Sequence, residues 1–224
     1  MEMKLKHLVK LWPVIFFTVL KAQGAVMEQY DFNNVNQAIP DGNASGVSYT
    51  GTVPGSSAIT EIGSVQVTLN ISSDGNGSLY AYLEHDGRIA VLLNRIGRTA
   101  TDLVGSDGQG LVITLNDSVA YTDVHQATGS PLTGTFQPDA RLVDPSQVLD
   151  TSPRSAFLSA FQTQSGTGDW TLFVANLESG STSTLNSWSL QMVAVPEPAI
   201  SSLCVALGLL GLAAGKRILH RHNA

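Results

Sequence analysis

The chain has 224 residues, of which 43% are hydrophobic and 13% are charged, and its formal net charge is −6. Between residues 25 and 195 there is no lysine, and sixteen acidic residues face five arginines, a net charge of −11. Such a surface repels nucleic-acid phosphates and anionic lipid headgroups, which excludes nucleic acid as a partner. The single cysteine, Cys204, excludes an intramolecular disulfide. This length, without the two termini, suits one folded domain.

The N-terminus, residues 1–24, is typical of a secretory signal peptide. Three lysines precede an apolar run at residues 11–20, and small residues suited to cleavage follow at residues 22–24. We therefore expect export through the Sec translocon. An uncleaved anchor is the alternative, although Pro13 and the short apolar run argue against a permanent helix.

Alternating apolar and polar residues predict a series of strands. The clearest is at residues 62–71, where Val65, Val67, Leu69 and Ile71 share one face. Two later strands each have a tryptophan on their apolar face. One face of the first contains Trp170, Leu172 and Val174, and one face of the second contains Trp188, Leu190 and Met192. The other predicted strands lie at residues 46–53, 79–83, 89–93 and 111–115, and the two tryptophan strands at 170–177 and 185–193.

Turn residues predict how these strands are joined. A turn at residues 73–77 is expected to make a hairpin of the strands at 62–71 and 79–83. Ser152 and Pro153 predict a short helix through Phe161, with serine as N-cap and proline at the first helical position. Seven or eight strands without a repeat favour one all-β antiparallel sandwich or jelly roll.

The C-terminus has three parts in order: a short motif at residues 195–198, an apolar segment at 199–215 and a basic tail at 216–224. The motif residues are Val195, Pro196, Glu197 and Pro198, and the basic residues expected to flank a membrane are Lys216, Arg217 and Arg221. This arrangement resembles the PEP-CTERM sorting signal, which Gram-negative bacteria use to present secreted proteins to an exosortase-type membrane protease.

The resemblance implies a route for the protein. The C-terminal helix would hold an intermediate in the inner membrane, and processing near the motif would deliver the domain to the outer surface or extracellular matrix. The alternative is a plain transmembrane anchor, since seventeen apolar residues make about 25 Å of helix. Both interpretations place the domain outside the cytoplasm.

Between the termini the sequence contains seven short motifs, at residues 39–41, 67–71, 111–117, 131–138, 158–161, 168–172 and 185–190. Their order resembles that of the P domain, or Homo B domain, of proprotein convertases. The resemblance covers residues 25–194 and implies a jelly-roll β-sandwich or barrel of about eight strands, galactose-binding-like in fold. The family normally follows a subtilisin-like protease domain and stabilises it, but this chain has no room for one. Ser78 stands where the family usually has an aspartate.

No catalytic machinery is predicted. The two candidate bases outside the termini, His85 and His125, accompany no serine elbow of the Gly-x-Ser-x-Gly type. We interpret both as solvated turn histidines and predict that the protein is not an enzyme.

Calcium is the one cofactor that the sequence suggests, because this hard cation takes oxygen ligands from Asp, Asn and loop carbonyls. Each candidate ligand also has an explanation as a turn residue. The candidates are Asp74, Asn76, Asp107, Asn116 and Asp117.

Together these features predict a secreted, non-catalytic protein of the cell surface or matrix with a structural or adhesive domain. One alternative is an accessory module that stabilises or targets a separately encoded subtilisin-like protease. The other is a glycan-binding module for exopolysaccharide, in which tyrosines stack on sugars. Cross-strand packing explains such tyrosines equally well, and the four concerned are Tyr49, Tyr80, Tyr82 and Tyr121.

Overall fold

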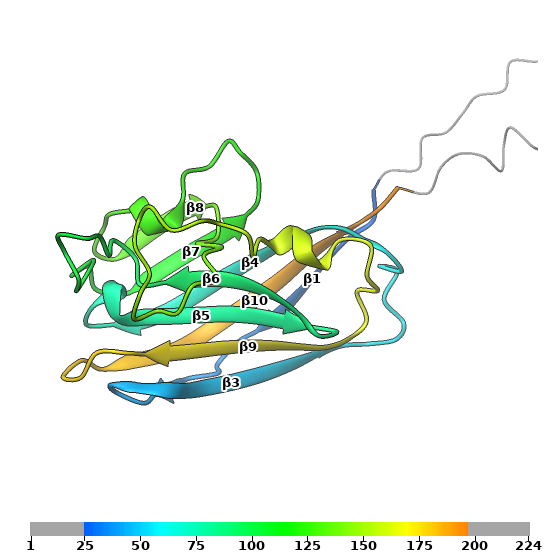
Figure 1. Cartoon of the computed structure of the whole chain (residues 1–224). Coiled ribbons are helices and arrows are strands. Elements are labelled where there is room, and N and C mark those ends of the chain that lie inside the picture. The colour runs from blue at the N-terminus through cyan, green and yellow to red at the C-terminus, as the bar shows by residue number, and fades with distance from the viewer. Residues whose placement is uncertain (1–24, 197–224) are drawn as a thin grey trace, which may run out of the picture. The chain divides into compact units, whose positions relative to one another are not determined.

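A computed structural model describes residues 25–196, which form ten strands in two stacked sheets, and is shown in Figure 1. The six-stranded sheet runs in the order β1, β10, β4, β7, β8, and β2 also pairs with β10. Its strands are β1 (Met27–Phe32), β2 (Gln37–Ile39), β4 (Ile62–Ser73), β7 (Leu111–Asn116), β8 (Leu132–Phe136) and β10 (Ser183–Ala194). The expected all-β sandwich is confirmed.

The four-stranded sheet runs in the order β3, β9, β5, β6. Its strands are β3 (Asn43–Val53), β5 (Leu79–His85), β6 (Arg88–Asn94) and β9 (Gly168–Asn176). In the described residues the only helical elements are three short 3-10 turns: η1 (Asn76–Ser78), η2 (Val124–Gln126) and η3 (Leu158–Phe161).

The core lies between the sheets and follows the period-two pattern of the sequence. In the larger sheet Leu69 of β4 is opposite Trp188 of β10, and both are buried. In the smaller sheet Trp170 and Leu172 of β9 are fully buried. Each apolar side chain removed from water in this way stabilises the fold by about 1.5–3 kcal/mol.

All seven predicted strands are confirmed, but three further strands are present. β1 and β8 lie at the two edges of the six-stranded sheet, and β2 is only three residues long. Edge strands are half exposed and polar, so they carry a weak hydrophobic pattern. The expectation of a wholly antiparallel sandwich is wrong, because β8 runs parallel to β7.

The predicted hairpin at residues 62–83 is also wrong. β4 pairs with β10 and β7, whereas β5 pairs with β6 and β9 in the other sheet. The turn at residues 73–77 therefore crosses from one sheet to the other. Alternation shows that each segment is a strand, but it does not name the partner strand.

The helix predicted from Ser152 does not form, and only η3 at its far end is helical. The hydroxyl of Ser152 accepts a hydrogen bond from the N–H of Leu149, which closes the preceding turn instead. The next residues are extended against β6, where the N–H of Val91 donates to the carbonyl of Ala156 at 2.9 Å. Tertiary backbone bonds outweigh the local helix signal here.

Within residues 25–196 no helix is long and apolar enough to cross a membrane. The predicted signal peptide, transmembrane segment and basic tail, at residues 1–24, 199–215 and 216–224, lie outside the described residues.

Candidate functional site

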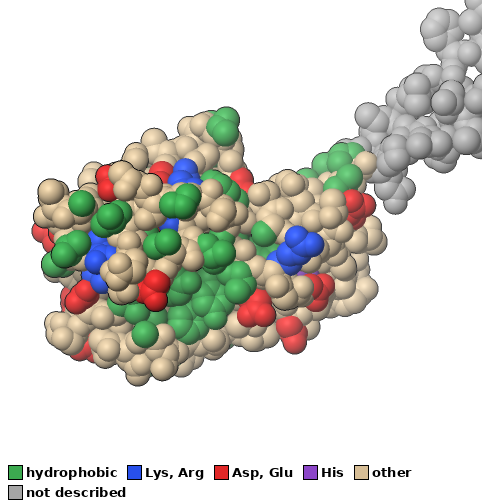
Figure 2. Space-filling view, in the orientation of Figure 1, with side chains coloured by type: hydrophobic (Ala, Val, Ile, Leu, Met, Phe, Trp, Pro, Cys, Tyr) green, Lys and Arg blue, Asp and Glu red, His purple; other side chains and the backbone are tan. Residues whose placement is uncertain are grey.

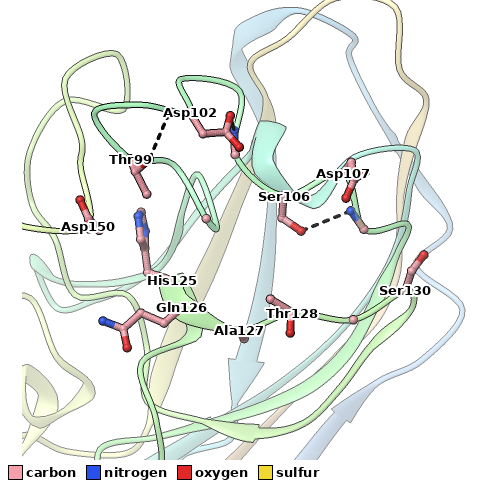
Figure 3. A pocket seen from close by; sticks show the side chains of 14 residues that line it. Thr99, Asp102, Ser106, Asp107, His125, Gln126, Ala127, Thr128, Ser130 and Asp150 are labelled. Atoms are coloured by element: carbon pink, nitrogen blue, oxygen red, sulfur yellow. Dashed lines mark hydrogen bonds between the residues drawn. The ribbon is translucent and has the colours of Figure 1, made fainter.

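Loops at one end of the sandwich surround an open pocket of about 730 Å³. The long loop after β6 supplies one wall, η2 and the loop that follows it supply another, and Asp150 completes the rim. Figure 3 shows Asp102, Asp107 and Asp150 spread around the pocket, with His125 lying between them. Three carboxylates therefore surround a pocket whose other lining side chains are small or polar.

Local hydrogen bonds give the first wall its shape. Asp102 Oδ1 accepts from the N–H groups of Val104 and Gly105, at 3.1 and 3.0 Å. Gly105 has φ +82°, and a Cβ at this position would lie 2.6 Å from the Ile96 carbonyl oxygen. Only glycine fits this close approach of two backbones.

His125 lies at the base of the pocket and is 1% exposed. The carboxylate of Asp123 accepts from the His125 N–H and so caps η2. The His125 Nδ1 atom is 2.7 Å from Asp139 Oδ2, and its Nε2 atom is 2.8 Å from the Arg98 carbonyl oxygen. Both oxygens are acceptors, so only the doubly protonated ring donates to both.

The pKa of His125 reflects opposing causes. Burial lowers the pKa, but the hydrogen bond and charge of Asp139, together with the bond to the Arg98 carbonyl, raise it by more. The nearby charge of Arg141 lowers it slightly. The net result is a raised pKa, which agrees with the two acceptors that the ring faces.

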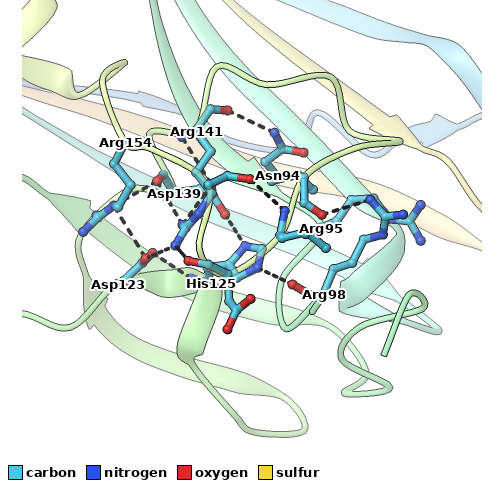
Figure 4. Close-up of polar contacts among 12 residues, drawn as sticks. Asn94, Arg95, Arg98, Asp123, His125, Asp139, Arg141 and Arg154 are labelled. Carbon is cyan, nitrogen blue, oxygen red and sulfur yellow. Dashed lines mark hydrogen bonds and ion pairs between the residues drawn. The ribbon is translucent and has the colours of Figure 1, made fainter. Parts of the chain in front are cut away.

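Behind His125 lies a buried ionic cluster, drawn in Figure 4, which consists of Asp123, His125, Asp139, Arg141 and Arg154. The Arg141 guanidinium lies 2.8 Å from Asp123 Oδ2 and 3.3 Å from Asp139 Oδ1. The side chains of Asp123, Asp139 and Arg141 are at most 8% exposed. The cluster holds the irregular segment 137–156 against the sandwich.

The prediction that His125 is a solvated turn residue is wrong, and so is that for His85. His85 is 1% exposed and its ring stacks on Trp170 at a centroid distance of 4.0 Å. Its Nδ1 and Nε2 atoms face the carbonyl oxygens of Asp169 and Ser165, at 2.9 and 2.8 Å. His85 is the last residue of β5 and continues the buried alternation of Leu79 onward, which places its ring in the core.

Neither histidine has a ring nitrogen turned to a nucleophile, since all four nitrogens face carbonyl or carboxylate oxygens. A general base must have a nitrogen within hydrogen-bond reach of the group that it deprotonates. In the part of the chain that the structure describes, both histidines therefore act as structural residues.

The structure separates the predicted calcium ligands into two groups. Asp74, Asn76 and Asp107 lie near Leu111, the first residue of β7, whereas Asn116 is the last residue of β7 and Asp117 follows it. Five residues of strand, about 17 Å, separate the two ends. The five residues cannot ligate one ion.

Most of these side chains already have structural partners. Asp74 Oδ2 accepts from the N–H and hydroxyl of Thr182, and these bonds lower the pKa of Asp74. Asp117 accepts from the N–H groups of Leu158 and Ser159 at the start of η3.

The other candidates differ in whether their side-chain oxygen atoms have a hydrogen-bond partner. Asn116 Oδ1 accepts from the N–H of Ser118 at 2.8 Å. Asn76 is fully buried and donates to the Gly110 carbonyl, but its Oδ1 atom has no partner. Among the described residues no group of three or more His, Cys, Asp or Glu is arranged to hold a metal ion. The calcium assignment stays a prediction, and Asn76 with Asp107 is the part of it that the geometry leaves available.

The four tyrosines proposed for sugar stacking do not share a surface. Tyr49 points into the sandwich, where it contacts Phe32 and Trp188. Tyr80 and Tyr82 lie on the opposite, outer face of the same sheet. Tyr121 is 40% exposed in the loop before η2.

Of the sorting motif the structure describes two residues, Val195 and Pro196, which are exposed directly after β10. The Val195 N–H donates to the Glu61 carbonyl at 2.9 Å. Glu197 and Pro198 lie outside the described residues, as do Lys216, Arg217 and Arg221.

No family model and no curated protein matches this chain. Among solved structures it is similar to the serine protease of Aeromonas sobria, with 17% identity and a TM-score of 0.43 over 77% of this chain and 28% of that one. The complex of that protease with the chaperone ORF2 gives 16% identity, a TM-score of 0.43 and coverage of 77% and 27%. This chain therefore spans little more than a quarter of the chains that it matches, and we draw no conclusion about function or partner from the likeness.

Proposed function

We propose that residues 25–196 form an exported, non-catalytic accessory module with the jelly-roll fold of a P/Homo B domain, which stabilises or targets a separately encoded subtilisin-like serine protease. The observation that carries the proposal is the placement of the family's tryptophan motifs. Trp170 and Trp188 lie in different sheets and are both buried in the core. The residues on which the resemblance rests thus hold the two sheets together.

The proposal that the module is non-catalytic is supported by its two histidines. Their ring nitrogens are occupied by the main chain and by Asp139, so neither His85 nor His125 is placed as a base. An accessory module needs only a stable fold and a contact surface.

Export and sorting complete the proposal. The Sec translocon would carry the chain across the inner membrane, and an exosortase-type protease would process it near the motif at residues 195–198, for display at the outer surface or in the matrix. The end of β10 at Ala194 supports this placement, because Val195 and Pro196 already lie outside the sheet and are exposed. A protease needs such an accessible stretch of backbone outside the sheet.

The test is to isolate the exported protein from its own cells with an antibody and to identify bound proteins by mass spectrometry. We expect a subtilisin-like protease, whose thermal inactivation becomes slower when purified full-length chain is added back. Recovery of no such protease, or a protease whose inactivation rate is unchanged, would refute the accessory role.

A further inference from the structure

We propose that the outer face of the four-stranded sheet docks an extended segment of a partner protein that has an apolar centre and basic residues at both ends. The centre of this surface, called here the aromatic face, consists of Tyr80, Tyr82 and Phe173. The proposal goes beyond the accessory role, since it does not require the partner to be a protease.

The aromatic face is built by the register of two neighbouring strands. Tyr82 of β5 is opposite Phe173 of β9, and their rings stack at a centroid distance of 4.8 Å and an angle of 17°. Tyr80 lies against both, at 6.0 and 6.2 Å. The alternate residues of β5 point into the core, so these three rings lie on the outside, where they are half-buried.

One side of the aromatic face is bounded by another segment of the chain. Residues 139–156 run along β6, where the N–H of Ala140 donates to the Val91 carbonyl and Asn94 donates to the Arg141 carbonyl. The outer side of β6 is thereby covered, while β5 and β9 stay open beside it. Figure 2 shows a continuous hydrophobic area on this side of the molecule, with carboxylates on either side of it.

Carboxylates lie at both ends of the aromatic face. Glu84 follows Tyr82 by two residues on the same side of β5. Burial raises the pKa of Tyr82, and the charge of Glu84 raises it further. Burial is also the main cause that raises the pKa of Tyr80, to which the charges of Tyr82, Asp144 and Asp139 add. Asn94, which pairs with Tyr80 across β5 and β6, donates to the carbonyl of Val143, the residue before Asp144, so Asp144 lies near the Tyr80 end. Tyr80 and Glu84 are about 13 Å apart along the strand.

The basic residues of the domain do not neutralise these carboxylates. Residues 25–196 contain no lysine, and four of the five arginines, Arg95, Arg98, Arg141 and Arg154, are engaged with carbonyl oxygens or acidic partners inside the fold. The fifth, Arg88, is exposed in β6 opposite His85 and makes no ion pair with Glu84 or Asp144 in the described residues. A segment with basic residues about four positions apart would place one near each carboxylate, while its apolar centre covers the rings. Charge complementarity thus selects a basic partner.

The same geometry disfavours two other occupants. A sugar stacks on an open ring face, and Tyr82 and Phe173 each already use one ring face for their mutual stacking. A second copy of this chain would bring together two acidic domains, since residues 25–195 carry a net charge of −11 in each copy. Like charges brought into contact oppose association.

The experiment uses the full chain in detergent and a fluorescent synthetic peptide with a leucine and phenylalanine centre flanked by arginines. Binding is followed by fluorescence anisotropy, and two matched peptides carry glutamate flanks or a serine centre. We expect the arginine peptide to bind, with affinity that falls as salt is raised, and both matched peptides to bind at least about tenfold more weakly.

The double variant Glu84→Gln with Asp144→Asn tests the surface without disturbing the fold, because asparagine keeps the hydrogen bond that Asp144 accepts from the Ser146 N–H. We expect this variant to bind the arginine peptide about tenfold more weakly. The control, Asp31→Asn with Glu61→Gln, removes the same charge from exposed positions elsewhere and should bind as the unchanged protein does.

Four outcomes would overturn the proposal. Two concern the peptides: equal binding of the arginine and glutamate peptides, and unchanged binding of the arginine peptide by the double variant of Glu84 and Asp144. The other two concern other occupants: retention on a neutral polysaccharide that is abolished by Tyr82→Ala, and a dimer in sedimentation that dissociates in Tyr82→Ala. None of these outcomes depends on whether a protease is recovered with the exported protein. Failure of the docking surface is therefore distinguishable from failure of the accessory role.

Discussion

The buried carboxylate of Asp139 gives the sharpest prediction, because its charge is shared by two buried cations. It faces His125 Nδ1 at 2.7 Å and accepts from Arg141 Nη1 at 3.3 Å. The substitution Asp139→Asn keeps the size of the side chain and removes its charge. Breaking one partner of a buried ion pair costs about 3–5 kcal/mol, a large part of the ~5–15 kcal/mol that stabilises a domain.

The same substitution should change how stability depends on pH. The pKa of His125 is raised above its ordinary value of 6.5, so the folded state holds this proton more tightly than the unfolded chain. The stabilisation is complete below about pH 6.5 and is lost as the pH rises through the folded-state pKa. Over that window the free energy of unfolding should fall by up to about 1.4 kcal/mol per pH unit.

Urea denaturation of the full chain in detergent, followed by tryptophan fluorescence at a series of pH values, measures both effects. Asp139→Asn should lower the free energy of unfolding by about 3–5 kcal/mol below pH 6.5 and flatten its decline above that pH. Asp150→Asn is the matched control, since this exposed carboxylate on the pocket rim makes no ion pair among the described residues. An unchanged pH slope in Asp139→Asn would refute the charged pairing of His125.

Three further predictions concern other parts of the chain. Gly46 has φ +49°, and a Cβ there would lie 2.4 Å from the Val174 carbonyl oxygen, so Gly46→Ala should lower the free energy of unfolding by more than about 1 kcal/mol in urea titrations. The calcium proposal predicts that EDTA lowers the Tm by emptying a site at Asn76 and Asp107, and an unchanged Tm would dismiss it. Mass spectrometry of the mature protein should find a C-terminus near residues 195–198, and an intact tail through Ala224 would leave a plain membrane anchor.

Strands that bury one face could be predicted from the sequence, because such burial requires apolar and polar residues to alternate along the strand. In β4 the apolar side chains at Val65, Val67 and Leu69 alternate with polar ones, and all three are buried. β1 has no such buried face, since as an edge strand it is exposed or half-buried along its length. The pairing of strands could not be predicted either, because β4 and β5 have the same pattern in different sheets.

The site was less predictable than the fold because its contacts are distant in sequence. Nothing local indicates that Asp123, Asp139 and Arg141 meet behind His125, and the segment that contains them has no periodic pattern. One signal was available in the sequence: Arg141 is a cation in an irregular segment that contains no lysine, which indicates that it pairs with a carboxylate. His85 was predictable in part, since the alternation of β5 continues through it.

Apart from histidine, all side-chain cations that make contacts inside this domain are arginines, and residues 25–196 contain no lysine. Arg98 donates from Nε to the Leu103 carbonyl and from Nη1 to the carbonyls of Pro145 and Val148, so one side chain ties three backbone groups from two loops. A planar guanidinium can satisfy several fixed acceptors at once, which an ammonium group does less well. Because four of the five arginines in residues 25–195 make their contacts inside the fold and only Arg88 is exposed, most carboxylates at the surface have no basic partner. The same division of charge that holds the irregular segment in place therefore leaves the acidic outer face ready for a basic partner.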